Sequence, residues 1–137
     1  MTEDDLKRRT KRFALRVLKL VAALPRTIAG RTIGNQLARS GTSVPANYRA
    51  ACRARSKAEF ISRLGVVEEA GDESALWLEL TMDGDLLKKE LVEPLWIEAN
   101  ELVAIMTSSR KSAAKSLVTT VRSKVRNAPI ANQKSKF

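Results

Sequence analysis

Lysine and arginine side chains, gathered in two clusters, are the groups in this sequence best suited to chemistry with another molecule. The first cluster, the basic ridge, has cations at spacings of four, four and three residues: Arg8, Arg12, Arg16 and Lys19. The second, the basic joint, has four cations within nine positions that contain no acid: Arg49, Arg53, Arg55 and Lys57. Cations that neutralise phosphates release counterions, and the guanidinium of arginine also forks onto a phosphate. The two clusters therefore predict salt-dependent binding of nucleic acid that is largely independent of sequence.

Five further cations join this prediction: Arg39, Lys115, Arg122, Lys124 and Arg126. The formal net charge is +10, and it is unevenly distributed along the chain. Residues 1–63 hold 15 Lys/Arg against four acids, residues 64–109 hold two against eleven, and residues 110–137 hold eight against none. The acids of the middle segment could instead pair with Arg39, Arg49 and Arg53. Because positive charge remains in excess after such pairing, we expect an anionic partner.

Four carboxylates lie roughly along one face of a predicted third helix, at Glu68, Asp72, Glu79 and Asp83. Helix bundles can hold two iron ions with such carboxylates, but those sites also use histidine in Glu-x-x-His pairs. The sequence contains no histidine. We therefore predict no metal and no cofactor, and we interpret this face as solvated or paired with arginine.

Three other side chains could do chemistry, and for each we favour a packing role. Cys52 lies beside arginines that could lower the pKa of its thiol, but no histidine is present to act as its base. Tyr48 and Trp77 could stack on bases, although packing in a core or an interface is favoured for both. The sequence also lacks a glycine-rich phosphate loop, a serine triad and a zinc spacing. We therefore expect no catalytic residue and no enzyme activity.

Helical periodicity and helix-ending residues predict the first two of four helices. The first covers residues 4–24 and ends at Pro25, with an apolar face made of Leu6, Phe13, Val17, Leu20, Val21 and Leu24. The second runs from about residue 27 to about residue 53, with a kink near Pro45. Small residues recur in it every four positions, at Gly30, Gly34 and Ala38. We interpret this strip as a surface for close helix contact.

Capping and turn residues predict the other two helices. A capping box at residues 56–59, with Ser56 as N-cap and Glu59 reaching back, starts the third helix. Its core face is Phe60, Leu64, Val67, Ala75, Leu78 and Met82, and a second apolar strip of Val66, Ala70 and Trp77 predicts burial on two sides, one of which could be a subunit contact. After a turn at residues 83–85, we expect a helical turn over residues 86–91 and a main fourth helix from about Glu93, with Pro94 in its first turn. Its predicted core face is Leu95, Ala99, Leu102 and Met106.

Four helices joined by short turns pack most simply as an all-α, antiparallel up-down four-helix bundle. We predict that residues 1–112 form this bundle. Residues 113–137 form a basic C-terminal extension that either continues the helix or is disordered until it meets a partner. A single cysteine excludes an intramolecular disulfide, and no apolar run is long enough to span a bilayer. We therefore expect a cytoplasmic protein.

Four segments carry a family resemblance: residues 37–49, 54–61, 77–80 and 98–102. Together they resemble the bacterial four-helix-bundle proteins found inside intervening sequences of 23S ribosomal RNA genes. The resemblance covers about residues 10–112, so the extension is a departure from the family. The same superfamily includes accessory proteins of diversity-generating retroelements, which resemble pentameric barrels that bind a reverse transcriptase and nucleic acid. The resemblance therefore implies a homopentamer.

Three hypotheses follow for function. The first is a non-enzymatic, oligomeric scaffold that binds nucleic acid, with RNA favoured, through the ridge, the joint and the extension. The second is an accessory subunit of a reverse transcriptase that binds the enzyme and its template RNA. The third is a purely structural oligomer whose charges pair between subunits.

Overall fold

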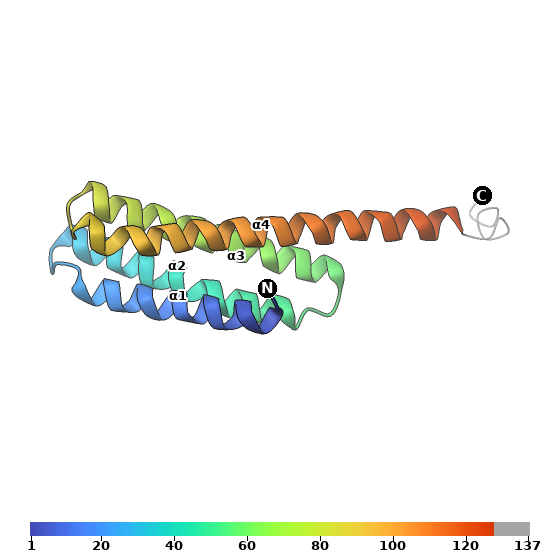
Figure 1. Ribbon diagram of the computed structural model, residues 1–137, viewed down its shortest axis with the longest axis horizontal. Coiled ribbons are helices and arrows are strands. Elements are labelled where there is room, and N and C mark those ends of the chain that lie inside the picture. Colours follow the sequence, from blue (N-terminus) through green and yellow to red (C-terminus); the bar gives the residue numbers. More distant parts are fainter. Residues whose placement is uncertain (128–137) are drawn as a thin grey trace.

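The computed structural model describes residues 1–127, and four helices make up almost all of this part. They are α1 (Glu3–Ala23), α2 (Ile28–Cys52), α3 (Lys57–Asp83) and α4 (Lys89–Arg126). Consecutive helices pack side by side in alternating directions, and α4 returns to contact α1 (Figure 1). The α1–α4 contact is the sparsest of the four, and in the diagonal pairs α1–α3 and α2–α4 the Cα atoms stay more than 8 Å apart. The predicted all-α, antiparallel up-down four-helix bundle is therefore confirmed.

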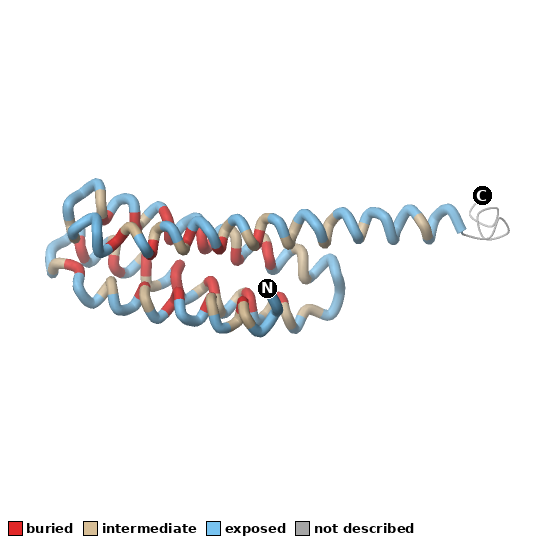
Figure 2. The backbone as a smooth tube through the Cα atoms, in the orientation of Figure 1, coloured by how far each residue is buried: buried red, intermediate tan, exposed pale blue. Residues whose placement is uncertain are grey.

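The core lies along the axis of the bundle, where the apolar faces of the four helices meet (Figure 2). Each helix contributes side chains with at most 1% of their surface exposed: Phe13, Val17, Leu37, Val44, Leu64, Leu78, Leu102 and Met106. Most of the side chains predicted to form the core are buried or partly buried in the structure. The core also contains hydroxyl groups, and the Ser74 hydroxyl links α3 to α2 through an Oγ–Oγ distance of 2.9 Å to Ser40.

Side-chain caps set the starts of α1 and α3. The Asp5 N–H donates to the Thr2 hydroxyl and the Thr2 N–H donates to the Asp5 carboxylate, a complete capping box that begins α1 one residue earlier than predicted. At α3 the Glu59 N–H donates to Ser56 Oγ, as predicted. The reciprocal bond differs, because the Glu59 carboxylate accepts from the N–H of Arg55 instead of Ser56.

Small residues set the approach of α1 to α2. A Cβ atom added at Gly41 would lie 2.7 Å from Cγ1 of Val17, so the two helices can be this close only where a side chain is missing. Of the strip predicted for close helix contact, Gly30 leaves no room for a Cβ, which would overlap the carbonyl oxygen of Pro25. A Cβ added at Gly34 would lie 3.4 Å from Val21 Cγ1 and Leu24 Cδ1, so this position does not itself require glycine. Four residues after Gly41, Pro45 lies inside an uninterrupted α2. Proline has no N–H to donate to the Gly41 carbonyl, and the kink expected there stays a prediction.

The start of α4 differs from the prediction. No helical turn covers residues 86–91 as a separate unit, and α4 begins at Lys89 instead of Glu93. Pro94 therefore lies in the second turn, where its missing N–H leaves the carbonyl of Glu90 without a helical donor. Both residues are exposed, so water can satisfy that carbonyl.

The C-terminal extension continues α4 as a helix through Arg126, and residues 128–137 lie outside the described part. Lys57, the first residue of α3, donates a hydrogen bond of 2.7 Å to the Ser116 hydroxyl, so the start of α3 lies beside this part of α4. Residues 117–126, the projecting segment, extend beyond the other three helices (Figure 1). Within residues 1–127, no helix is both long enough and apolar enough to cross a membrane.

Candidate nucleic-acid interface

The basic ridge lies on α1, on the side away from the core. Arg8, Arg12 and Lys19 are exposed, and Arg16 is half-buried. Arg8 is the one member that meets a carboxylate within residues 1–127, because its Nη2 lies 2.7 Å from Oδ1 of Asp5, one turn earlier on the same helix. The other three guanidinium and ammonium groups can therefore face an external anion.

Arg9, next to the ridge in sequence, faces α4 and is fully paired. Its guanidinium donates two hydrogen bonds to the Glu98 carboxylate, at 2.8 and 2.7 Å, and a third to Glu101 at 2.6 Å. Hydrogen bonds from Arg9 hold the pKa of the Glu98 carboxyl below its usual range, against the opposing effect of burial. Arg9 therefore closes the sparse α1–α4 contact and is not available to a ligand.

Arg16 and Lys19 lie over a shallow groove between α1 and the start of α4. The groove is lined mainly by leucines, namely Leu20, Leu87, Leu91 and Leu95. The alkyl stems of long cations cover apolar surface of this kind while the charged ends stay in water. The alkyl part of Arg16 therefore packs on the leucines while its guanidinium stays in solvent. This explains why Arg16 is half-buried and Arg12 is exposed.

Arg49 and Arg53 of the basic joint lie together at the end of α2, and Lys7 of α1 lines the same shallow pocket. Lys7 was missed in the sequence. Its amino group lies 3.2 Å from the Glu3 carboxylate, an exposed pair one turn apart on the same helix. Lys7 flanks the apolar face of α1 on the side that meets α2. This position in the sequence could have indicated that Lys7 lies near the basic joint. The packing of α1 against α2 thus adds a third cation to two that were predicted.

The remaining predicted cations are spread over the surface. Arg39 lies ten residues before Arg49 on α2, or about 15 Å along the axis, so the structure does not bring it to the pocket. Arg55 is exposed in the α2–α3 connection, and Lys57 contacts Ser116. The four cations of the extension are exposed on α4: Lys115, Arg122, Lys124 and Arg126.

Twelve of the thirteen predicted cations have no carboxylate within ion-pair distance among residues 1–127, and Arg8 is the exception. The alternative in which Arg39, Arg49 and Arg53 pair with acids of α3 and α4 is therefore wrong for this part of a single chain. The arginines that do bridge helices, Arg9 and Arg110, were not among the predicted site residues.

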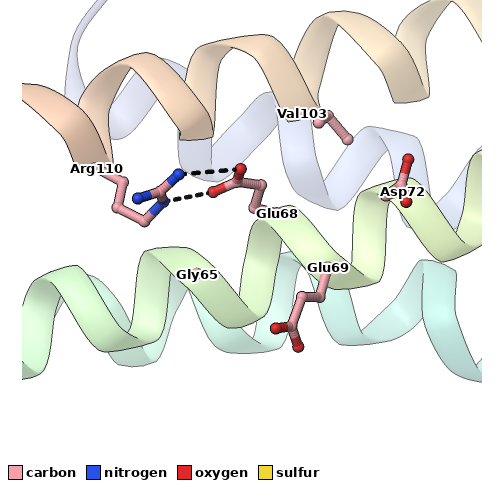
Figure 3. A pocket seen from close by; sticks show the side chains of 6 residues that line it. All are labelled: Gly65, Glu68, Glu69, Asp72, Val103 and Arg110. Carbon is pink, nitrogen blue, oxygen red and sulfur yellow. Dashed lines mark hydrogen bonds and ion pairs between the residues drawn. The ribbon is translucent and has the colours of Figure 1, made fainter.

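The acids of α3 behave differently from one another (Figure 3). Glu68 accepts hydrogen bonds of 2.7 Å from Arg110 Nε and from the Thr107 hydroxyl, and these two donors lower the pKa of its carboxyl. Glu68, Glu69 and Asp72 all line a second groove, between α3 and α4, but the carboxylates of Glu69 and Asp72 point in other directions (Figure 3). No group of three potential metal ligands occurs in the described residues. The arginine-paired interpretation thus holds for Glu68.

Cys52 and Tyr48 are buried to different degrees beside each other on α2. Burial raises the pKa of the Cys52 thiol, so the expectation that neighbouring arginines could lower it is wrong. Burial also raises the pKa of the Tyr48 hydroxyl, and with 5% of its surface exposed Tyr48 cannot stack on a base. Trp77 is half-buried and its Nε1 lies 3.4 Å from Glu73 Oε1. The packing role favoured for these side chains agrees with their burial.

The fold and the surface define a class of protein: an up-down helical bundle in which many surface cations meet no carboxylate within residues 1–127. Within this class, the chain belongs to the family of 23S rRNA-intervening sequence proteins, whose model matches residues 3–108. It is also similar to the crystal structure of a protein of unknown function from the S23 ribosomal protein family of Bacteroides thetaiotaomicron, with 29% identity and a TM-score of 0.73. That similarity covers 81% of this chain and 99% of the other. No curated protein matches the chain.

Proposed function

We propose that this protein is a non-enzymatic scaffold that binds RNA through the phosphate backbone. The observation that carries the proposal is the unpaired cations of the bundle surface, above all Arg12 and Lys19 on the ridge and Arg49 and Arg53 beside Lys7. Each arginine that forms an ion pair within residues 1–127 has a nitrogen 2.6–2.7 Å from a carboxylate oxygen, whereas Arg12, Arg49 and Arg53 have no carboxylate oxygen of these residues within 4.0 Å. The family description, 23S rRNA-intervening sequence protein, supports RNA over DNA.

The test is binding of single-stranded and double-stranded RNA and DNA, measured by fluorescence anisotropy over a series of salt concentrations. Phosphate binding predicts that log K falls linearly with log salt, by roughly 0.7 per phosphate contact on single strands and about 0.9 on duplex DNA. A flat salt dependence, or no binding at low salt, would overturn the proposal.

Three double variants with equal charge changes locate the interface. The ridge variant is Arg12→Glu with Lys19→Glu, and the joint variant is Arg49→Glu with Arg53→Glu. Arg26→Glu with Arg31→Glu is the control, because both residues are exposed near the other end of α2. We expect each of the first two to weaken RNA binding by about tenfold or more and to lower the salt slope, and the control to change binding by less than about threefold. Equal losses in all three would mean that net charge, and not these surfaces, governs binding.

We also propose that this scaffold self-associates, and the family resemblance suggests an assembly of five chains. Exposed apolar side chains on two helices support it, since Leu15 and Leu18 on α1 and Leu76 and Leu80 on α3 are 41–58% exposed. The mass of the assembly in solution, measured by light scattering, tests this part separately. A single chain at all concentrations would remove self-association and leave RNA binding untouched.

A second candidate function, an accessory subunit of a reverse transcriptase, draws on the same exposed apolar residues as a docking surface for the enzyme. It predicts a salt-dependent RNA affinity together with a complex with a reverse transcriptase encoded nearby. A purely structural oligomer, in contrast, predicts an assembly that is insensitive to salt and has no affinity for RNA. Co-purification of the two proteins and the salt series together separate these candidates.

A further inference from the structure

The projecting segment carries an apolar stripe that the other residues of 1–127 do not cover. Val118, Val121 and Val125 are 49%, 51% and 64% exposed, and with Ala114 they recur at spacings of four, three and four. This is the heptad spacing with which one helix packs along another. Arg122 and Lys124 flank the stripe, and neither meets a carboxylate in the described part of the chain. The segment therefore presents an apolar face flanked by cations, which is suited to packing against a helix of opposite charge.

The outer face of α3 has matching properties. Val66, Glu69, Glu73, Leu76 and Leu80 recur on it at spacings of three, four, three and four. The three apolar residues are 38–46% exposed, and the two acids are also exposed. Glu69 and Glu73 form no ion pair within residues 1–127, and Asp72 and Glu79 add further unpaired acid beside them. This outer face thus has the same heptad spacing, with two glutamates between its apolar residues, and no other helix of residues 1–127 covers it.

The two stripes are similar in length and opposite in charge. Residues 114–125 span about 17 Å of helix, and residues 66–80 span about 21 Å. The segment contains Arg122, Lys124 and Arg126 and no acid, whereas residues 66–80 contain five acids and no cation. Opposite charges beside an apolar seam favour this pairing and disfavour the pairing of either stripe with itself.

A chain cannot bring its own two stripes together. The segment leaves the bundle at the end where α3 begins, as the Lys57–Ser116 contact marks, and it points away from α3 (Figure 1). Leu76 and Leu80 lie near the other end of α3, beside the α3–α4 turn. Contact within one chain would require α4 to break, although it is one helix from Lys89 to Arg126.

We propose that the projecting segment of one chain docks on the outer face of α3 in a second copy, with Val118, Val121 and Val125 against Leu76 and Leu80 and with Arg122 and Lys124 beside Glu69 and Glu73. The contact joins two different surfaces, so each chain offers both halves and further copies can be added until the assembly closes. The family match ends at residue 108, and the proposed contact therefore uses a part of α4 outside that match. The proposal does not depend on RNA binding.

The α1 surface is a poorer receptor for the segment. Its exposed leucines, Leu15 and Leu18, lie among cations of the same sign as the segment, including Lys11, Arg12 and Lys19. Like charges placed opposite one another in an interface are unfavourable. The outer face of α3 is therefore the better receptor of the two.

Charge reversal on each stripe tests the contact, with the mass of the full chain measured by light scattering and sedimentation in the absence of RNA. One variant carries Arg122→Glu and Lys124→Glu, and the other carries Glu69→Lys and Glu73→Lys. All four residues are exposed, so both variants should keep the helical content of the parent. Each variant alone should need at least about tenfold more protein to assemble, because like charges then face each other. A chain that carries all four changes should assemble as the parent does, since every altered segment then meets a complementary α3 face whatever the number of copies.

Other outcomes overturn the proposal. If Glu69→Lys with Glu73→Lys assembles normally, the α3 face is not the receptor, and pairing of two projecting segments or docking on α1 takes its place. If the chain with all four changes does not recover, or if the parent is a single chain at all concentrations, the two stripes do not meet. The control Arg26→Glu with Arg31→Glu has the same charge change as the segment variant and should leave assembly within about threefold of the parent. Equal loss in this control would make the effect one of net charge alone.

Discussion

The two parts of α4 have similar apolar periodicity but very different surroundings. In residues 92–106 the apolar face is closed by the other helices, and Val92, Leu95, Leu102 and Met106 are at most 3% exposed. In residues 117–126 the face continues with Val118, Val121 and Val125, which are about half exposed or more. Burial falls off between Met106, the last buried residue of α4 in the described part, and Ser116, which the first residue of α3 contacts, and the helix itself continues (Figure 2).

This difference shows what apolar periodicity specifies. It specifies that a helix has a partner, but it does not say whether that partner belongs to the same chain. In the first part of α4 the partner is α3 of the same chain, and in the second part we propose α3 of another copy. A similar contrast holds for the arginines, since Arg9 is paired with Glu98 whereas Arg12 meets no carboxylate among residues 1–127.

The largest expected effect separates the two parts of α4 by stability. Leu102→Ala should lower the free energy of unfolding by about 2–5 kcal/mol, because it removes a side chain that is 1% exposed and leaves a cavity. Val121→Ala should change it by less than about 0.5 kcal/mol in a single chain, because Val121 is 51% exposed. Urea unfolding at low protein concentration measures both values. A comparable loss for Val121→Ala would mean that the projecting segment packs within its own chain.

A smaller effect is expected for the ion pair that ties the first part of α4 to α1. Glu98→Gln should lower the free energy of unfolding by about 1–2 kcal/mol at pH 7, because it weakens charged hydrogen bonds from the guanidinium of Arg9. The matched control is Glu90→Gln, an exposed residue of α4 without an ion pair in the described chain, which should change it by less than about 0.5 kcal/mol.

The Glu98 effect should also depend on pH. The folded-state pKa of Glu98 lies below the ordinary glutamate value of 4.5, so the pair stabilises the protein fully above that value. The stabilisation is lost as pH falls below 4.5 and through the folded-state pKa, because the carboxyl becomes protonated in both states. The difference between the parent and Glu98→Gln should therefore be constant from about pH 7 to pH 5 and shrink at lower pH. A difference that grows on acidification would contradict the assigned pair.

Much of the fold follows from the sequence, because long apolar periodicities and side-chain caps are local signals. The faces that include Phe13, Leu64 and Leu102 were predicted and are buried. The start of α4 was predicted wrongly, since no side chain caps it and Pro94 was the one visible marker. An exposed proline is tolerated in the second turn, so this marker placed the start four residues too late.

The candidate site was less predictable, because pairing depends on which helices become neighbours. Arg8, Arg9 and Arg12 are alike in sequence, yet one meets Asp5, one meets Glu98 and one meets no acid in the described chain. Lys7 joins Arg49 only through the packing of α1 on α2. The number and sign of the charges were available from the sequence, but their partners required the structure.

The smallest expected effect uses two glycines of α3 to probe how closely α4 approaches along its length. A Cβ added at Gly71 would lie 2.9 Å from Cγ2 of Val103, a short and stiff side chain in the bundled part of α4. Overpacking there should outweigh the better helix propensity of alanine, so Gly71→Ala should lower the free energy of unfolding by about 1 kcal/mol. A Cβ at Gly65 would have Cδ of Arg110 as its nearest neighbour, at 3.9 Å, and Gly65→Ala should raise the free energy of unfolding by about 0.5–1 kcal/mol. Urea unfolding of both variants measures the difference in sign. If both variants are more stable than the parent, α3 and α4 pack no more closely at Gly71 than near the point where α4 leaves the bundle.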